Sequence, residues 1–295
     1  MTSRIIVGVD GSATSLTALR WAAYEARRRK VGLLVMSCYS VPVYGSPEGA
    51  VYATSEGLDV VKESAEAIVT EAIETVAAID PATAVEGMAT MGPATTAIPD
   101  EAQAGDEIVV GASGHTGVID GLLGSVAMSL VHRSHVPVIV VPAHPAVEAH
   151  PSMNKIVVGV DGSPASLQAL EWAYNEALVS GAELTAVHGW VSPHSSSSTP
   201  VDEPRTQMQL EATQALQASI ESLGARLTDG SLHVHSKLIE QSPADALLEE
   251  SGDADLVVVG SHGHGAIRST LLGSVSRTVA EHASCPVAVI RQAES

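Results

Sequence analysis

The sequence predicts an α/β fold with two tandem domains, each an open parallel five-stranded sheet with helices on both faces. Two observations carry this prediction. The segment Ile5–Ser12 recurs as Ile156–Ser163, so the chain contains one domain twice. Within each copy, β-branched runs alternate with helical patterns, which is typical of a parallel sheet covered on both faces. We therefore expect a Rossmann-like domain in each half.

The elements of the first copy follow one another from the N-terminus. Ser12 suits the N-cap of the first helix, as Ser163 does in the second copy, where Pro164 fits the first turn. The apolar stripe expected to lie on the sheet comprises Leu16, Leu19, Ala22, Ala23 and Ala26. The pattern predicts strands at 4–9, 32–38, 84–89, 107–110 and 137–141, and helices at about 13–29, 58–78, 94–104 and 125–134. A loop is expected at 42–57.

Proline residues between the two copies mark an irregular connector. Pro142, Pro145 and Pro151 all lie in this stretch, which reaches to about Asn154. We therefore expect domains at 1–142 and 155–295, joined by a linker at 143–154.

The charge balance excludes two classes of partner. Acidic residues outnumber basic ones by 34 to 15, which gives a formal net charge of −19. This charge repels a nucleic-acid backbone or an anionic membrane surface, and we expect neither as a partner. The longest apolar runs are short, and Met1–Arg4 leads directly into a strand, so we expect a cytoplasmic chain without a signal peptide or membrane insertion. Backbone dipoles and a metal ion still allow a small nucleotide to bind.

Two features that resemble functional signals have simpler structural interpretations. The basic run Arg27–Lys30 ends the first helix, where cations complement the helix dipole, and the second copy has Leu178–Gly181 instead. We therefore interpret the run as a solvated helix end. Cys38 and Cys285 are not repeated between the copies, and we expect both to be small buried side chains rather than reactive thiols.

A glycine-rich loop follows a predicted buried strand in each copy. The first is Gly111-Ala112-Ser113-Gly114, followed after nine residues by Gly124-Ser125. The second is Gly260-Ser261-His262-Gly263, again with nine residues before Gly273-Ser274. Backbone N–H groups of such a loop can converge on a phosphate, and the N-terminus of the next helix adds its dipole. The repeated loop predicts two bound nucleotides.

The glycines are expected to serve this binding directly. We expect Gly111 and Gly114 to permit close approach of the backbone and to adopt positive φ angles. Because the loop has no lysine, it is not a Walker loop. The alternative is that the glycines only make tight strand-to-helix turns.

A carboxylate is expected opposite each glycine loop. Asp10 and Asp161 follow the first strand of each copy, while Gly111 and Gly260 end the fourth. In an open parallel sheet, ligands bind beyond the carboxyl ends of the strands, where the strand order reverses. The carboxylate suits an adenine amino group or a ribose hydroxyl, because it would repel a phosphate.

Histidines in or beside the loops raise the alternatives of a metal site or a general base. These are His115, His262 and His264. Since no acidic third ligand is evident near them, we expect a phosphate contact or a solvent-facing ring and no metal held by the protein. No activated nucleophile or serine–histidine–acid arrangement is evident. We therefore expect no catalytic residue and at most slow hydrolysis of the nucleotide.

With these motifs, both halves resemble the universal stress protein family in its ATP-binding branch. The pattern of that branch is Gly, two residues, Gly, nine residues, Gly, then Ser or Thr, and the likeness covers nearly the whole chain. The tandem arrangement is similar to two-domain members of actinobacteria. The resemblance implies an adenine nucleotide alpha hydrolase-like fold and ATP with Mg²⁺ as the ligand.

The resemblance also implies binding residues, which we carry over by position. Adenine and ribose contacts are expected at Gly8, Asp10 and around Cys38 in the first copy, and at Gly159, Asp161 and around Gly189 in the second. Contacts to ribose and phosphates are expected along the loops, at Gly111, Ala112, Ser113, Gly114, His115, Gly117, Gly124, Ser125 and Val126, then at Gly260, Ser261, His262, Gly263, His264, Gly273, Ser274 and Val275. The family often has a histidine after the second strand, which is His188 in the second copy but Ser37 in the first. The first site is therefore expected to be the weaker one.

Three classes of function remain open. The first is a regulator in the stress response whose shape or partners change with nucleotide occupancy, and we favour it. The second is a slow ATPase or other nucleotide-dependent enzyme, and the third is a scaffold that binds no nucleotide. The resemblance implies that the two domains pair through their edge strands, Val136–Val141 and Pro286–Arg291, while a homodimer and the regulatory protein partner stay open.

Overall fold

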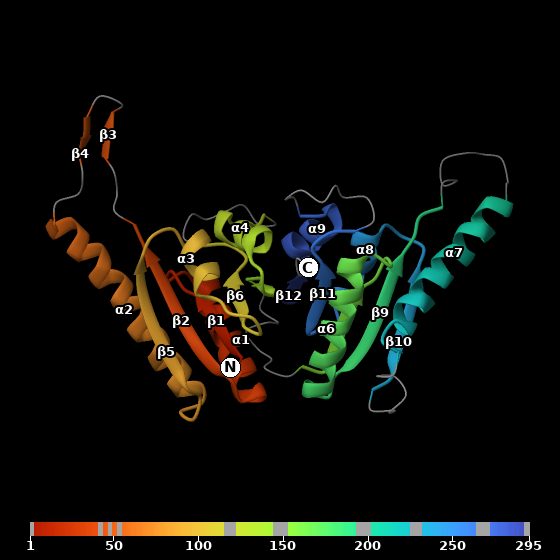
Figure 1. Cartoon of the computed structure of the whole chain (residues 1–295), viewed down its shortest axis with the longest axis horizontal. Coiled ribbons are helices and arrows are strands. Elements are labelled where there is room, and N and C mark those ends of the chain that lie inside the picture. Colours follow the sequence, from red (N-terminus) through yellow and green to blue (C-terminus); the bar gives the residue numbers. More distant parts are fainter. Residues whose placement is uncertain are drawn as a thin grey trace. The chain divides into compact units, whose positions relative to one another are not determined.

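The chain forms two compact units, residues 1–151 and 152–295. The computed structural model describes residues 3–40, 44–46, 49–51, 55–114, 122–143, 153–192, 202–224, 232–263 and 272–291. Figure 1 shows that each unit consists of one sheet between helices. Among the described residues, no helix combines the length and apolar character needed to span a bilayer.

The first unit is an open sheet of parallel strands in the order β5–β2–β1–β6–β7. The strands are β1 (Arg4–Gly8), β2 (Gly32–Tyr39), β5 (Val85–Met91), β6 (Glu107–Gly111) and β7 (Val138–Val141). The helices are α1 (Ala13–Arg29), α2 (Ser55–Ile79), α3 (Ala94–Glu101) and α4 (Ser125–Arg133). Helices α1 and α2 contact each other on one face of the sheet, and α3 and α4 contact each other on the opposite face.

The second unit repeats this arrangement with the strand order β10–β9–β8–β11–β12. Its strands are β8 (Lys155–Gly159), β9 (Glu183–Gly189), β10 (Val234–Ile239), β11 (Leu256–Gly260) and β12 (Val287–Ile290). Its helices are α6 (Pro164–Ser180), α7 (Asp202–Glu221), α8 (Pro243–Ser251) and α9 (Ser274–His282). The predicted fold class is thereby confirmed in both halves, with element bounds that shift by a few residues.

Two short strands of the first unit were not predicted. The expected loop at 42–57 contains a short antiparallel pair, β3 (Tyr44–Ser46) and β4 (Gly49–Val51), and α2 begins at Ser55. The pair is separate from the main sheet, as Figure 1 shows. Strands of three residues are too short to produce a recognisable alternation of apolar and polar side chains, which is why the sequence pattern missed them.

The first helix of each unit begins as predicted. The hydroxyl of Ser12 accepts a hydrogen bond from the backbone N–H of Ser15 at 3.2 Å, and Ser163 does the same for Ser166 at 3.3 Å. These bonds satisfy N–H groups that have no partner within the helix. Of the predicted stripe on α1, Leu16 is half-buried, while the other four residues, Leu19, Ala22, Ala23 and Ala26, are buried against the sheet. The helix that connects the first two strands of each unit therefore begins at a capping serine, and in the first unit the apolar face of α1 packs on the sheet.

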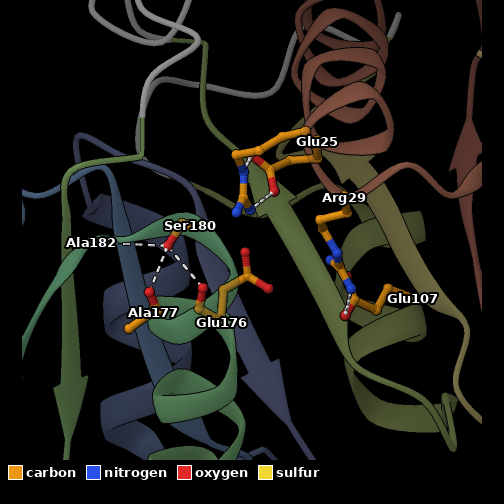
Figure 2. Close-up of polar contacts among 8 residues, drawn as sticks. Glu25, Arg29, Glu107, Glu176, Ala177, Ser180 and Ala182 are labelled. Carbon is orange, nitrogen blue, oxygen red and sulfur yellow. Dashed lines mark hydrogen bonds and ion pairs between the residues drawn. The ribbon is translucent and has the colours of Figure 1, made fainter. Parts of the chain in front are cut away.

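The basic run at the end of α1 differs from the solvated end that we expected. Arg29 makes two hydrogen bonds to the carboxylate of Glu107 on β6, of 2.6 and 2.8 Å, and the side chain of Glu107 is only 7% exposed. Arg28 pairs with Glu25 one turn earlier. Figure 2 shows the pair of Arg29 and Glu107. Residues 28 and 29 thus neutralise buried carboxylates. The role of Arg29 could not be predicted from the sequence, because it depends on where the fold places Glu107.

The second unit has uncharged side chains at the positions of Arg29 and Glu107. Ser180 occupies the position equivalent to Arg29 and donates its hydroxyl to the carbonyl of Glu176 at 2.8 Å, as Figure 2 also shows. The position equivalent to Glu107 is Leu256, which is fully buried. The end of the first helix is therefore bound to the fourth strand by an ion pair in the first unit, whereas the second unit has uncharged side chains at both positions.

Candidate functional site

The candidate site of each unit lies where the strand order reverses. Strands β1 and β6 are parallel neighbours, yet the chain continues from β1 to one side of the sheet and from β6 to the other. Strands β8 and β11 have the same relation in the second unit. The loops that follow these strands therefore meet at the carboxyl edge of the sheet, where ligands bind in open α/β folds.

In the first unit, Asp10 lies against the glycine loop. Its Oδ1 accepts hydrogen bonds from the backbone N–H and the hydroxyl of Ser12, at 3.0 and 2.6 Å. A Cβ atom added to Gly114 would lie only 2.7 Å from Asp10 Oδ2. Gly11 makes the turn between Asp10 and α1 with a φ of +83°. The carboxylate is thus held in place on one side and packs on the bare backbone of Gly114 on the other.

The second unit brings the equivalent residues together. Asp161 Oδ1 accepts a hydrogen bond from the N–H of Ser163 at 2.9 Å, and a Cβ atom on Gly263 would lie 2.5 Å from Asp161 Oδ2. Gly162 has a φ of +80° and makes the same turn as Gly11. The pairing of a carboxylate with a glycine loop is therefore built twice in one chain.

The first glycine of each loop has a different reason to be glycine. A Cβ atom on Gly111 would lie 2.9 Å from the carbonyl carbon of Thr14, and one on Gly260 would lie 2.7 Å from that of Ala165. Both clashes are with the backbone of a helix N-terminus, which cannot move aside cheaply. This crowding requires glycine at 111 whether or not a ligand binds, and the close approach of the loop backbone to a ligand stays a prediction. The predicted positive φ is wrong for Gly111 and Gly114. Proximity to the backbone of α1, and not a left-handed backbone, excludes a side chain at Gly111. At Gly114 the crowding atom is a side-chain oxygen of Asp10, which can shift.

The last glycine of each motif opens a helix whose first amides receive no side-chain cap from the residues that the structure describes. Gly124 is the N-cap of α4 and Gly273 that of α9, and neither N-cap makes a side-chain hydrogen bond. The first intrahelical bond of α4 runs from the N–H of Met128 to Gly124, so the amides of Ser125 and Val126 precede it. In α9 the amides of Ser274 and Val275 hold the same place, because the first bond there runs from Arg277 to Gly273. Such N–H groups, with the helix dipole behind them, favour an anion.

A hydrogen bond closes each loop back on itself. The N–H of Gly124 donates to the carbonyl of Ala112 at 2.7 Å, and that of Gly273 donates to the carbonyl of Ser261 at 2.8 Å. The beginning of each loop is thereby tied to the start of the next helix. The carboxylate, the loop backbone and the helix N-terminus consequently form one connected site in each unit.

Comparison with known proteins decides the family. The family model for the universal stress protein family matches residues 1–142 and 153–291, which together are most of the chain. The chain belongs to the universal stress protein family. It is 36% identical to the universal stress protein Rv1996 of Mycobacterium tuberculosis over 97% of this chain and 94% of that one. A universal stress protein of Mycolicibacterium smegmatis is also 36% identical, over 97% of this chain and 96% of the relative.

Solved structures support the fold of this universal stress protein. The crystal structure of a universal stress protein from Archaeoglobus fulgidus matches with a TM-score of 0.70 and covers 99% of both chains, at 20% sequence identity. At this identity the likeness concerns the fold, including the tandem repeat, and says nothing of the ligand.

The predicted adenosine side of the universal stress protein site contains glycines with packing roles. A Cβ atom on Gly8 would lie 2.9 Å from Ile98 Cδ1, and one on Gly159 would lie 2.8 Å from Leu247 Cδ1. Gly189 is more constrained, since its Cβ would lie 2.6 Å from the Cα of Pro243. The backbone at the start of α8 therefore leaves no room for a side chain at Gly189, and packing explains this glycine without a ligand. At Gly8 and Gly159 the crowding atoms are the ends of flexible side chains on α3 and α8, so packing alone does not require glycine there.

The side chains at the end of the second strand differ between the units. Cys38 is half-buried in the first unit, and burial raises the pKa of its thiol. The other free cysteine, Cys285, is buried elsewhere in the fold, and burial followed by the charge of Asp255 raises its pKa to about 12. In the second unit, His188 Nδ1 lies 2.7 Å from the carbonyl oxygen of Val160. Because a carbonyl only accepts, Nδ1 carries the proton, and this imidazole is already anchored to the end of β8.

A contact inside the second loop was missed by the sequence analysis. The hydroxyl of Ser261 lies 2.9 Å from Nδ1 of His262, although the residues are adjacent in the chain. Ser261 is only 1% exposed, and its hydroxyl is therefore poorly placed to attack a substrate. Nε2 of His262 is buried and has no hydrogen-bond partner within the described part of the chain. Adjacent residues carry no spacing signal, so only the side-chain orientations reveal the contact.

Three predicted site residues, His115, Gly117 and His264, lie outside the described residues. Among the residues that the structure describes, no group of three His, Cys, Asp or Glu side chains is arranged to hold a metal ion.

Proposed function

We propose that this universal stress protein binds one adenine nucleotide in each unit and acts as a nucleotide-dependent regulator. The observation that carries the proposal is the pairing of Asp10 with Gly114 and of Asp161 with Gly263, beside a helix start whose N-cap is a glycine without a side chain to cap the amides. A scaffold that binds no nucleotide would require glycine only where a side chain would clash with backbone atoms that cannot move. At Gly114 and Gly263 the crowding atom is a mobile carboxylate oxygen, so packing alone does not demand glycine there.

The charges set the direction of the ligand in this proposal. The carboxylate of Asp10 repels a phosphate and accepts hydrogen bonds from a ribose hydroxyl or an adenine amino group. The amides of Ser125 and Val126 have the opposite preference, because they donate hydrogen bonds at the positive end of α4. We therefore orient the adenosine toward Asp10 and the phosphates toward α4, with the same polarity between Asp161 and α9. Mg²⁺ in such a complex is held mainly by phosphate oxygens and water.

A regulatory role fits this polarity better than rapid turnover. Hydrolysis needs a group that orients a water molecule at the terminal phosphate, and in this orientation the carboxylates lie at the other end of the ligand. Measuring bound nucleotide and released phosphate on the same sample separates the function classes. Retention with negligible release supports the regulator, steady release supports a slow ATPase, and no retention supports a scaffold.

Valine at Gly114 and Gly263 tests the site assignment. In the double variant Gly114→Val/Gly263→Val, the new side chains displace the Asp10 and Asp161 carboxylates and cover the loop amides. We expect ATP affinity to fall by at least about tenfold in both units, about 1.4 kcal/mol each. Isothermal titration calorimetry measures this, and thermal unfolding checks that the fold persists.

A matched control is available in the same chain. A Cβ atom on Gly32 would lie 3.7 Å from its nearest neighbour and one on Gly252 would lie 3.4 Å away, which are ordinary contacts outside the site. The double variant Gly32→Ala/Gly252→Ala should therefore retain ATP. Unchanged ATP affinity in the Gly114/Gly263 variant would contradict the assignment.

A further inference from the structure

Two histidines lie next to each other on the edge strand of the second unit. His233 directly precedes β10, His235 is the second residue of that strand, and both side chains are exposed. Their ring centroids are 4.9 Å apart, and the ring planes form an angle of 88°. Because residues two apart on a strand point to the same face of a sheet, the backbone itself brings these two imidazoles together.

The distance between the rings suits two ligands of one metal ion. An imidazole nitrogen binds a transition-metal ion at about 2.0–2.1 Å, so two rings at about 90–110° around one ion have centroids about 4.5–5.2 Å apart. The observed separation of 4.9 Å lies within this interval. Both rings are exposed and can turn about their side-chain torsions, which directs one nitrogen of each toward a common point without moving the backbone.

The charges around the pair allow a cation to bind. Lys237 follows on the same face of β10, but its Nζ donates hydrogen bonds to both carboxylate oxygens of Glu250, at 2.7 and 2.8 Å. Nζ of Lys155 also pairs with Glu250, at 3.5 Å. Glu183 of β9 is exposed and, by the register of β9 and β10, lies beside His233. The two lysines are thus matched by two carboxylates, and the net charge of −19 attracts cations to the chain.

The first unit has no such pair. The strand registers of the two units place Ala84 and Glu86 where the second unit has His233 and His235. All four side chains are exposed, so packing requires histidine at neither position. The pair is a feature of the second unit alone, and the first unit provides a matched background without it.

We propose that His233 and His235 together bind one divalent ion of a late transition metal, such as Zn²⁺ or Cu²⁺, with water at the remaining positions. Imidazole nitrogen prefers these ions to Mg²⁺ and Ca²⁺, which prefer oxygen ligands. In the part of the chain that the structure describes, no group of three His, Cys, Asp or Glu side chains is arranged as a metal site. The site is therefore an open one with two protein ligands at the surface.

This inference does not depend on the proposed function. His235 lies near the amino end of β10, whereas the candidate nucleotide site lies beyond the carboxyl ends of β8 and β11. Since the strands are parallel, the two sites occupy opposite edges of the sheet. An ion held by the histidines is consequently distinct from Mg²⁺ bound with a nucleotide.

Titration with Zn²⁺, without added nucleotide, tests the site in the full chain. We expect the ring resonances of His233 and His235 to shift together in NMR spectra, while Mg²⁺ at the same concentrations leaves them unchanged. By calorimetry, His233→Gln or His235→Gln should each weaken this binding at least about tenfold, because loss of even an outer-shell partner of a metal ligand typically costs that much. The control His282→Gln removes a single exposed histidine from α9 and should leave the affinity unchanged.

The first unit allows the reciprocal experiment. The double variant Ala84→His/Glu86→His should add a second Zn²⁺ site, and thermal unfolding without metal checks that each variant keeps its fold. Unchanged Zn²⁺ affinity in both single variants would overturn the inference, as expected if the histidines only protect an edge strand from pairing. An equal response of the two rings to Mg²⁺ would also overturn it, because the attraction would then be one of charge alone. A double variant that gains no site would contradict the claim that two imidazoles at this spacing suffice.

Discussion

Arg29 and Glu107 show how much a buried residue depends on its partner. Their two hydrogen bonds, of 2.6 and 2.8 Å, lie at the base of the first unit's sheet, where both side chains are largely buried. Taking two charges from water offsets much of their attraction, so the pair as a whole adds little stability, whereas a lone buried charge is strongly destabilising. The second unit, with Ser180 and Leu256 at these positions, supplies a natural uncharged solution.

We expect the single variant Arg29→Ser to lower the free energy of unfolding by about 3 kcal/mol, because it leaves Glu107 buried without its main counter-charge. The double variant Arg29→Ser/Glu107→Leu, which copies the second unit, should recover most of that loss. Urea unfolding measures both, and Arg20→Ser on the exposed face of α1 controls for the loss of an arginine from the helix. A double variant no more stable than the single one would contradict this account.

Elements were easier to predict than the contacts between their side chains. Strand β6 and its glycine loop were found because an apolar run ends at a glycine and a helical pattern follows. The same pattern could not show that Gly111 is crowded by Thr14 while Gly114 is crowded only by a carboxylate, since both are simply glycine in the sequence. The short strands β3 and β4, and the Ser261–His262 contact, depend on geometry that leaves no periodic signal. The rest of the site therefore required the structure.

Helix α8 illustrates a tertiary contact with a measurable electrostatic signature. The carboxylate of Glu250, near the end of this helix, forms ion pairs with Nζ of Lys237 on β10 at 2.7 Å and with Nζ of Lys155 on β8 at 3.5 Å. Burial acts to raise the pKa of Glu250, but the hydrogen bond and charge of Lys237, with Lys155 behind it, outweigh burial and lower the pKa below its usual 4.5. A carboxyl group with a lowered pKa in the folded state stabilises the fold above its unfolded pKa and loses this contribution as the pH falls.

Glu250→Gln should therefore cost about 0.5–1 kcal/mol at pH 7, since Lys237 is half exposed and its attraction is screened by solvent. The difference in unfolding free energy should shrink toward zero as the pH falls from about 5 to below the lowered pKa. Urea unfolding at a series of pH values gives this profile. The neighbouring variant Glu249→Gln removes a carboxylate that contacts Gln241 instead of a lysine, and it serves as the control. A cost that is independent of pH would exclude the ionic contribution.

At the scale of the whole molecule, duplication made the fold predictable. A motif seen once leaves many topologies open, but the same order of strands, helices and glycine loop occurring twice permits one domain architecture. The repeat also supplies internal controls, because equivalent positions of the two units carry different residues. Examples are Ser113 and His262, and Arg29 and Ser180. How the two units associate is a separate question, which the resemblance to the family answers only with a prediction of paired edge strands.

Hydrogen exchange along β7 tests that prediction within one strand. The carbonyls of Pro137 and Val141 accept hydrogen bonds from Ile108 and Ala112 on the β6 side. Because donors and acceptors of a strand between two neighbours alternate in direction, Ile139 also faces β6, while the amides of Val138 and Val140 are directed away from it.

If the predicted pairing with Pro286–Arg291 covers this edge, the amides of Val138 and Val140 should be as protected in the full chain as that of Ile139. In a separately produced chain of residues 1–151, studied at concentrations where it is monomeric, Val138 and Val140 should exchange much faster while Ile139 stays protected. Ile139 thus reports whether the unit itself remains folded. Rapid exchange of Val138 and Val140 in the full chain would contradict edge-strand pairing, because an amide at an uncovered edge has only water as its partner.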